Sequence, residues 1–240
     1  MVIDELKAAL GEKVSVNATI REHHSKDESF HIPTLPDAVV FATCTQDVAT
    51  TLKICNDNKT PVVAWGAGTS LEGNSTPVRG GISLDLSQMD KILRVSSEDL
   101  DCTIQPGVRR KQLNEHLSRY GLFFPVDPGA DATLGGMAST GASGTTTVKY
   151  GAMKQLVMSL TVVTANGEII TTSRRARKTS AGYDLTHLFV GSEGTLGVIT
   201  ELTLRVFGIP EVIAAATMQF DSVREAIDGV IEAIQLNVGV

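Results

Sequence analysis

The spacing of apolar residues predicts a strand–helix–strand unit in the first third of the chain. Residues 38–42 and 61–65 are short apolar runs of the kind found in buried strands. Between them, Val48 and Leu52 recur at helical spacing, and Thr45 is placed to cap the N-terminus of that helix. Two strands joined by a single helix should run parallel, with a right-handed crossover.

Residues 2–11 carry an apolar stripe that predicts a short helix, and the polar segment 17–35 that follows has no clear period. Downstream, strand-like patterns outnumber helical ones, and Asn166-Gly167 between two such patterns indicates a tight hairpin. The predicted helix spans 108–120, and the predicted strands span 82–86, 92–95, 101–105, 160–165, 168–172 and 197–206. The fold class expected is α+β, with a small parallel βαβ part and a larger, mainly antiparallel sheet with helices.

The last thirty residues carry apolar faces without an evident partner. Residues 212–220 read as a strand, and 223–234 as a helix with one apolar side. One strand and one helix cannot bury both faces alone. We therefore expect three parts, with boundaries at 1–35, 36–210 and 211–240, the last being the start of a further, truncated domain. Self-association through 212–240 would be a second way to cover these faces.

Composition narrows the classes of function. The 240 residues carry a net charge of −6, so there is no basic surplus for nucleic acid. No run of about 18 apolar residues predicts a membrane span, and the acidic N-terminus does not resemble a secretory signal. Three cysteines, Cys44, Cys55 and Cys102, match no zinc site or disulfide framework and are expected to be buried free thiols. A cytoplasmic protein is expected.

Glycine is concentrated in segments that could hold an anion. The strand at 61–65 leads into Trp65-Gly66-Ala67-Gly68-Thr69-Ser70-Leu71-Glu72-Gly73-Asn74. Such a loop can offer several backbone N–H groups to one phosphate, with Thr69 and Ser70 adding hydroxyls. Its spacing is neither the dinucleotide fingerprint of a Rossmann fold nor a Walker loop. Taken alone, the segment is equally compatible with an ordinary glycine-rich turn.

Two further segments favour the binding interpretation. Residues 125–144 are nearly all small and cannot fill the space beside them, and 191–201 again begins with glycine turns and continues into a strand. Three such segments on an acidic chain of this size indicate a dinucleotide held by backbone groups.

These segments resemble the flavin-binding signatures of the vanillyl-alcohol-oxidase-type (PCMH-type) flavoproteins. They are most similar to the branch that contains the FAD-linked D-lactate and D-2-hydroxyglutarate dehydrogenases and the glycolate oxidase D-subunit. The similarity extends over about 20–240 and includes Ala181-Gly-Tyr-Asp-Leu185. It implies a two-subdomain FAD-binding fold at 36–210, followed from 211 by the beginning of a substrate (cap) domain.

The resemblance implies which residues contact FAD. They are Trp65, Gly66, Ala67, Gly68, Thr69, Ser70, Gly73, Asn74, Pro128, Gly129, Thr133, Leu134, Gly135, Gly136, Ser139, Gly141, Ala142, Gly144, Glu193, Gly194, Val198 and Ile199. Thr69 stands where relatives with covalent FAD carry histidine, which implies a non-covalent cofactor. No histidine of this chain matches the family's catalytic one, so no catalytic residue and no metal ligand are assigned.

The resemblance implies the FAD-binding portion of a flavin-dependent D-2-hydroxy-acid dehydrogenase of the D-lactate or glycolate type, with hydride transfer from substrate C2 to flavin N5. The 240 residues alone are expected to be inactive. A flavin-binding module that works only with a partner polypeptide is the alternative. The partners implied are a small 2-hydroxy acid and an electron acceptor, which would be a quinone, a cytochrome or an electron-transferring flavoprotein. The protein would be cytoplasmic or peripheral to the inner face of the membrane.

Three other features leave alternatives open. The cluster His23, His24, Asp27, Glu28 and His31 resembles a metal site by composition, although the matching family segment is not one. The basic run Arg174, Arg175, Arg177 and Lys178 is either a solvated loop or an anion-facing group near the flavin. Trp65 packs either on the cofactor or in the core.

Overall fold

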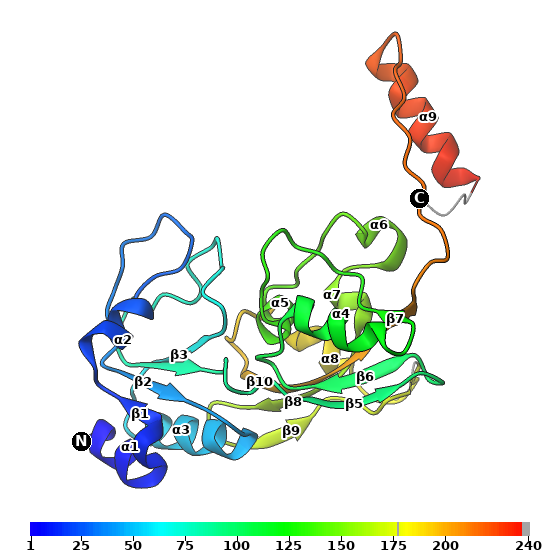
Figure 1. Ribbon diagram of the computed structural model, residues 1–240. Coiled ribbons are helices and arrows are strands. Elements are labelled where there is room, and N and C mark those ends of the chain that lie inside the picture. Colours follow the sequence, from blue (N-terminus) through cyan, green and yellow to red (C-terminus); the bar gives the residue numbers. More distant parts are fainter. Residues whose placement is uncertain (177, 237–240) are drawn as a thin grey trace.

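The computed structural model describes residues 1–176 and 178–236, and its strands form two lobes side by side (Figure 1). The N-terminal lobe holds a four-stranded sheet in the order β1-β2-β4-β3. Strands β2, β4 and β3 are parallel, and β1 is antiparallel to β2. The strands are β1 Val14–Ser15, β2 Ala38–Phe41, β3 Val62–Trp65 and β4 Ile82–Asp85; the helices are α1 Val2–Leu10, η1 Gly11–Lys13, α2 Ala18–His23 and α3 Thr45–Asp57.

The second lobe is a five-stranded antiparallel sheet in the order β5-β6-β10-β8-β9. Its strands are β5 Ile92–Ser96, β6 Asp101–Ile104, β8 Val157–Val163, β9 Ile169–Thr171 and β10 Val198–Arg205, and a small pair is formed by β7 Leu122–Phe123 and β11 Phe207–Gly208. Its helices are α4 Arg110–Ser118, α5 Leu134–Ser139, α6 Thr147–Tyr150, α7 Met153–Leu156 and α8 Leu185–Phe189. The α+β class and the parallel and antiparallel parts are confirmed.

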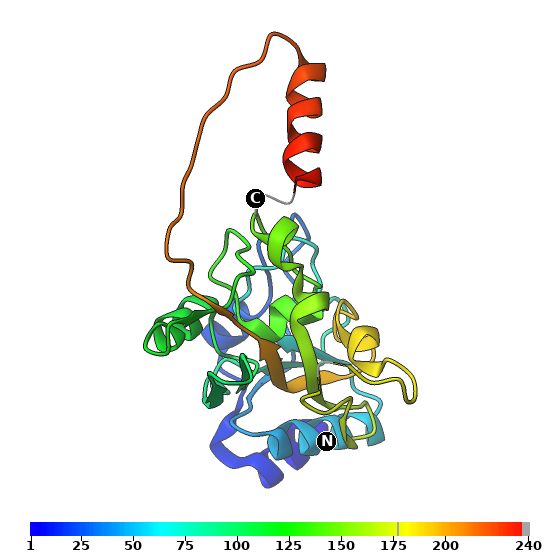
Figure 2. The ribbon, with the colours of Figure 1, turned by 90° about the vertical axis from the view of Figure 1, so that its right-hand side faces the viewer.

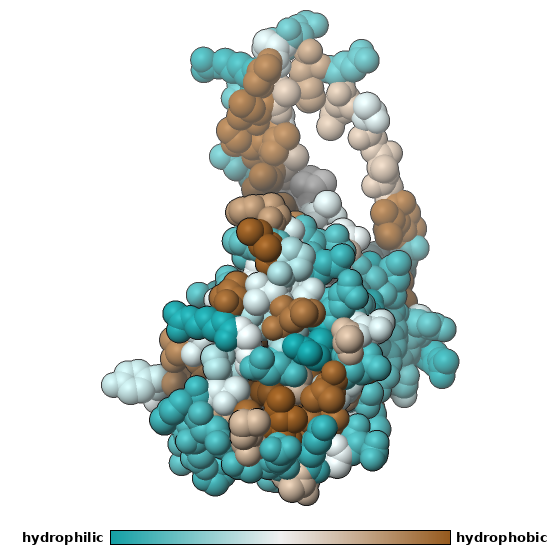
Figure 3. Space-filling view, turned by 90° about the vertical axis from the view of Figure 1, so that its left-hand side faces the viewer, coloured by the Kyte–Doolittle hydropathy of each residue, from teal (hydrophilic) through white to brown (hydrophobic). Residues whose placement is uncertain are grey.

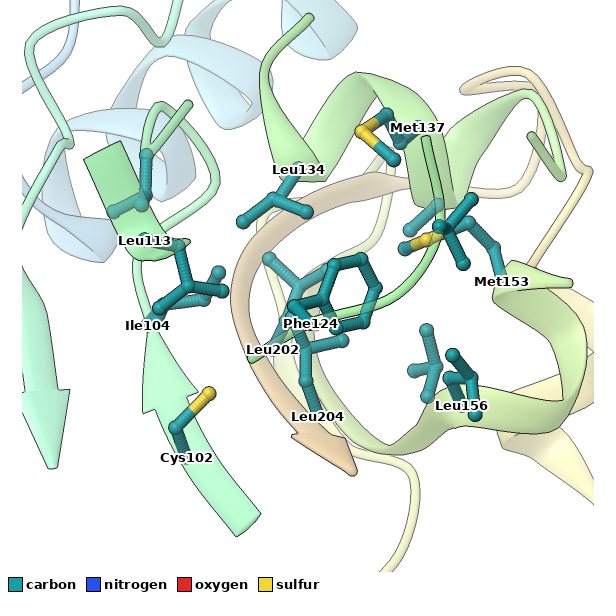
Figure 4. Close-up of a cluster of buried hydrophobic side chains, with 14 of the residues drawn as sticks. Cys102, Ile104, Leu113, Phe124, Leu134, Met137, Met153, Leu156, Leu202 and Leu204 are labelled. Atoms are coloured by element: carbon teal, nitrogen blue, oxygen red, sulfur yellow. The ribbon is translucent and has the colours of Figure 1, made fainter. Parts of the chain in front are cut away.

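Each lobe has its own hydrophobic core. In the second lobe, α4, α5 and α7 pack side chains such as Leu113, Met137 and Leu156 against Leu202 and Leu204 of β10 (Figure 4). The core of the N-terminal lobe gathers α1, α3 and strands β1, β2 and β4, together with Val163 at the end of β8 and Val198 at the start of β10. The long central strands therefore reach from one core into the other and hold the lobes together.

The predicted hairpin is confirmed at β8 and β9. Thr164 and Glu168 close it, with the Thr164 N–H donating to the Glu168 carbonyl at 2.9 Å. Gly167 has a φ of +85°, which is the backbone conformation that the Asn-Gly turn requires.

Several local expectations are corrected. Thr45 is the first residue of α3, and Cys44 occupies the cap position without a side-chain hydrogen bond. Cys44 is exposed, whereas the other two thiols are buried as expected. The segment 17–35 contains α2, whose Asn17 side chain accepts from the N–H groups of Thr19 and Ile20. The parallel direction predicted for β2 and β3 is confirmed, and β4 lies between them.

The expected strand at 212–220 is not formed. These residues are extended and exposed, and they pair with no strand in the described part of the chain, so their backbone groups have no ladder partner. The expected helix is present as α9, Val223–Gln235. It stands away from both lobes, connected by the extended segment (Figure 2). Within the described residues, no helix combines the length and apolarity needed to cross a membrane.

Replacing Phe124 by alanine should lower the free energy of unfolding by about 3–5 kcal/mol, because this ring is 1% exposed in the second-lobe core and its loss leaves a cavity. Phe30→Ala is the matched control: its ring is 91% exposed, and we expect a change within about 0.5 kcal/mol. Urea unfolding followed by circular dichroism measures both. Equal effects of the two substitutions would contradict the packing described here.

Candidate functional site

A cavity of about 800 Å³ lies between the two lobes. The N-terminal lobe contributes β3 and the loop after it, and the second lobe contributes the segments 128–143 and 193–199. The structure thus brings together three segments far apart in the sequence. All the residues that the sequence assigned to FAD line this cavity, except Gly73, Leu134, Gly141 and Gly144.

The four exceptions support the walls instead of lining them. Leu134 is fully buried in the second-lobe core. A Cβ at Gly144 would collide with Asp127, one at Gly73 with the His31 ring, and one at Gly141 would touch Gly191. Several lining residues were not predicted from the sequence, because small or apolar side chains do not by themselves indicate a binding site. Among them are Ser75, Leu86, Pro106, Met137, Thr195 and Gly197.

The first glycine loop leaves its backbone donors available. No hydrogen bond leads from the N–H of Gly66, Ala67, Gly68, Thr69 or Ser70 to any other described residue. All five residues line the cavity. Consecutive N–H groups without partners form an anion-binding concavity.

The conformation of this loop depends on glycine. Gly68 has a φ of +67°, and a Cβ there would stand 2.8 Å from Cζ2 of Trp65. Residue 68 therefore lies directly on the indole ring. Trp65 is 7% exposed, lines the cavity, and has a buried Nε1 with no partner. The ring of Trp65 is therefore both buried in the protein and part of the cavity wall, so the two positions considered for it do not exclude each other.

The second and third segments are fixed to one another. Gly135 N–H donates to the Pro106 carbonyl at 2.8 Å, so this amide is not available to a ligand. Only a glycine at position 135 can approach Pro106 this closely, because a Cβ would collide with it. The turn at 191–194 attaches to the end of α5, where Glu193 N–H donates to the Ser139 carbonyl at 2.9 Å. Glu193 has a φ of +53°, a strained conformation for a residue with a side chain.

The cavity wall carries no positive side chain. Among the described residues that line it there is no Arg, Lys or His, and the only charged ones are Glu72 and Glu193. An anion in this cavity would be held by backbone N–H groups and by the hydroxyls of Thr69 and Ser70.

Comparison with known proteins agrees with this geometry. The family described as "FAD binding domain" matches residues 36–173, more than half of the chain. The chain belongs to the FAD binding domain family. FAD is its cofactor, and the unpartnered amides of the first loop suit the pyrophosphate of that dinucleotide.

The chain is also similar to named proteins, which include a D-lactate dehydrogenase and a glycolate oxidase subunit. The chain is 46% identical to "Probable D-lactate dehydrogenase, mitochondrial" of Danio rerio, over 99% of this chain and 48% of that protein. It is 37% identical to "Glycolate oxidase subunit GlcD" of Bacillus subtilis, over 88% of this chain and 46% of that protein. The chain spans about half the length of the curated relatives it matches.

Among solved structures, an alkyldihydroxyacetonephosphate synthase superposes with a TM-score of 0.82 at 25% identity, covering 99% of this chain and 49% of that chain. The likeness supports the PCMH-type fold expected from the sequence.

In this FAD binding domain, Asp127 joins two loops beside the cavity. Its carboxylate accepts from Thr145 Oγ1 at 2.9 Å and from the N–H and hydroxyl of Thr146 at 3.4 and 3.3 Å. Partial burial raises the pKa of Asp127, but these hydrogen bonds outweigh it and leave the pKa below its usual value. The ionised carboxylate therefore ties Pro128-Gly129 to the loop at 142–147.

The other candidates lie off the cavity. No group of three or more His, Cys, Asp or Glu side chains that could hold a metal occurs among the described residues. Arg175 donates to Asp101 at 3.0 Å and to Asp99 at 2.6 Å, where the turn after β5 leads into β6. Arg174 and Lys178 are exposed, and Arg177 lies outside the described residues. In its described part, the basic run is a surface loop.

We expect Gly68→Val to reduce FAD affinity by at least about a hundredfold, because a branched side chain would strain the positive φ and displace the amides from the pyrophosphate. Two or three charge-assisted hydrogen bonds at about 1.5–3 kcal/mol each support this magnitude. Gly208→Val, where nothing lies within 4 Å of the new Cβ, is the control and should bind normally. Titration of apoprotein with FAD measures both; normal binding by Gly68→Val would identify the loop as an ordinary turn.

Asp127→Ala should weaken FAD binding about tenfold near neutral pH, since it releases the 142–147 loop, whereas Asp57→Ala on the exposed end of α3 should not. The Asp127 carboxylate has a lowered folded pKa, so its contribution is complete above the unfolded value of 3.8 and is lost as pH falls through the lower folded value. The difference between wild type and variant should stay constant from about pH 8 to 5 and vanish in stronger acid. If the difference in FAD affinity between wild type and Asp127→Ala disappears near neutral pH, the Asp127 carboxylate does not hold the 142–147 loop in place.

Proposed function

We propose that this chain is the FAD-binding portion of a flavin-dependent D-2-hydroxy-acid dehydrogenase of the D-lactate or glycolate type. In this reaction, hydride passes from substrate C2 to flavin N5. The proposal is supported by 46% identity over 99% of the chain to a relative named as a probable D-lactate dehydrogenase. The single observation that carries it is the inter-lobe cavity, walled by unpartnered backbone amides and lacking positive side chains among its described residues.

We assign roles by position around the cavity. The amides of residues 66–70 and the hydroxyls of Thr69 and Ser70 would hold the pyrophosphate. The small residues of 128–144, with Glu193 to Ile199, would surround the ribityl chain and isoalloxazine. FAD, when bound, supplies the hydride acceptor. The protein's share is to orient the flavin and to exclude water from its apolar wall, which includes Leu86, Met137 and Val198.

The cavity wall contains no group for the acid itself. Oxidation of a 2-hydroxy acid needs a cation to clamp the carboxylate and a base to take the hydroxyl proton. The described lining residues include no cation and no histidine, and their only charged side chains are the carboxylates Glu72 and Glu193. We infer that these groups come from outside residues 1–240, either from the remainder of a longer protein or, as the second candidate, from a partner polypeptide.

The electron acceptor is proposed to be a cytochrome, with a quinone or an electron-transferring flavoprotein as the other options. The support is that relatives of Arabidopsis thaliana and Saccharomyces cerevisiae, 43% and 40% identical, carry "[cytochrome]" in their names. We propose a location where such an acceptor is within reach, in the cytoplasm or at the inner face of a membrane. The same relatives are named mitochondrial.

The purified chain should be yellow and should release FAD into the supernatant on acid precipitation, because Thr69 cannot form the histidyl bond of the covalent relatives. Anaerobic D-lactate or glycolate should leave the visible flavin band unchanged in this 240-residue chain, while dithionite should bleach it. Colour that stays with the pellet, or FMN in the supernatant, would contradict the cofactor assignment. Bleaching by D-lactate would place the base and the carboxylate clamp within these residues.

We propose that α9 mediates self-association of the isolated chain. Its side chains Ile227, Val230, Ile231 and Ile234 are 46–59% exposed and form one apolar face (Figure 3). Exposed faces of this kind are uncommon on monomers. Light scattering should therefore give a mass above the monomer's 25.5 kDa, and Ile227→Glu with Ile231→Glu should restore the monomer. A monomeric wild type would contradict this.

A further inference from the structure

A short segment near the N-terminus braces the first glycine loop from outside the cavity. Ser75 Oγ donates to Asp27 Oδ2 at 3.1 Å, and Glu28 N–H donates to the Ser70 carbonyl at 3.0 Å. These contacts belong to the histidine- and acid-rich segment that the sequence analysis left without a role. The segment precedes the region matched by the FAD binding domain family and lines no part of the cavity.

At the start of this segment, His24 is buried and fully hydrogen-bonded. It is 2% exposed, with Nδ1 at 2.8 Å from the Ile20 carbonyl and Nε2 at 2.9 Å from Oδ2 of Asp85. Asp85 also accepts from Ser87 N–H at 2.7 Å. Both ring nitrogens therefore have a hydrogen-bond partner, one from the backbone of α2 and one from the end of β4.

The imidazole ring packs on Trp65. Their ring centroids are 4.4 Å apart, and the exposed His23 and the ring of Phe41 complete the surroundings, the latter 5.8 Å from His24. Trp65 in turn carries Gly68 on its indole. His24, Trp65 and Gly68 thus form a continuous column that ends at the unpartnered amides.

A purely structural role would not require a histidine here. A buried, hydrogen-bonded polar pair contributes little net stability compared with apolar side chains of the same volume. Fixed hydrogen bonds at both nitrogens, in contrast, lock the orientation of the ring. The orientation of the His24 ring matters for the loop, because the ring packs on Trp65 and a small tilt of Trp65 would move Gly68 and its neighbours.

We propose that His24, held by Asp85, is a positioning residue for FAD: it fixes Trp65 and through it the pyrophosphate loop. The inference rests on the assignment of residues 66–70 to the pyrophosphate.

Trp65 is the only tryptophan of the chain, so its fluorescence reports on this column alone. In His24→Ala apoprotein, the emission should shift to longer wavelength as water reaches the indole, and FAD affinity should fall at least tenfold. Asp85→Ala should cause a similar loss. Asp85→Asn should recover most of it, because the amide NH₂ can donate to Nε2 of His24 while the amide oxygen still accepts from Ser87 N–H.

Asp47→Asn is the matched control. Asp47 is buried in the same lobe, accepts from Lys13 Nζ at 2.6 Å and from Thr43 N–H at 2.9 Å, and lies away from the loop. It should lower the melting temperature without changing the FAD dissociation constant more than twofold or shifting Trp65 emission. His24→Gln, which keeps a donor toward Asp85, replaces His24→Ala if the latter does not fold.

Normal FAD affinity in a folded His24 variant would overturn the inference and leave the FAD assignment intact. The same holds if Asp47→Asn loses as much affinity as the His24 variant, because the effect would then follow stability alone. A wild-type chain that binds no FAD would overturn the proposed function together with this inference.

Discussion

The architecture depends on the close approach of the first glycine loop of the N-terminal lobe to the second lobe. At Gly66 the N-terminal lobe comes so near to Thr133 Oγ1 of the second lobe that no side chain fits between them. Within the second lobe, Gly135 meets Pro106 equally closely. At Gly66 the backbone of one lobe thus meets a side chain of the other. The five amides of the first loop lie at the cavity with no partner among the described residues.

This arrangement explains how an acidic protein can hold an anionic cofactor. The chain has a net charge of −6, and no described lining residue is positive. Backbone dipoles supply the complementary field without a lysine or arginine, whose charge would also attract other anions. Because no described lining residue is a cation, the cavity also lacks a group that could bind a substrate carboxylate. We therefore assign that task to residues outside this chain.

The sequence predicted best where local patterns decide the structure. The Asn166-Gly167 turn, the strand leading into Gly66, and the three glycine segments are properties of consecutive residues. Strand order was beyond reach, because the insertion of β4 between β2 and β3 depends on tertiary pairing. The error at 212–220 has a related cause: a run of apolar residues forms a strand only if a partner strand exists.

The residues that support the site were harder to predict than those that line it. His24 gives no helical or strand signal, and its partner Asp85 lies 61 positions away, so the pair exists only in the folded chain. Leu134 and Gly144 belong to the glycine-rich motif but do not line the cavity: they support the residues that form its wall. The motifs lie in the three segments that line the cavity, while the division between lining and supporting residues required the structure.

Amide hydrogen exchange with and without FAD tests the central claim most directly. If the unpartnered amides hold the pyrophosphate, peptides covering 65–74 should exchange fast in the apoprotein and become strongly protected on adding FAD, with smaller protection in 128–144 and 191–199. Slow exchange of residues 66–70 in the apoprotein, or protection by FAD confined to other segments, would contradict the account.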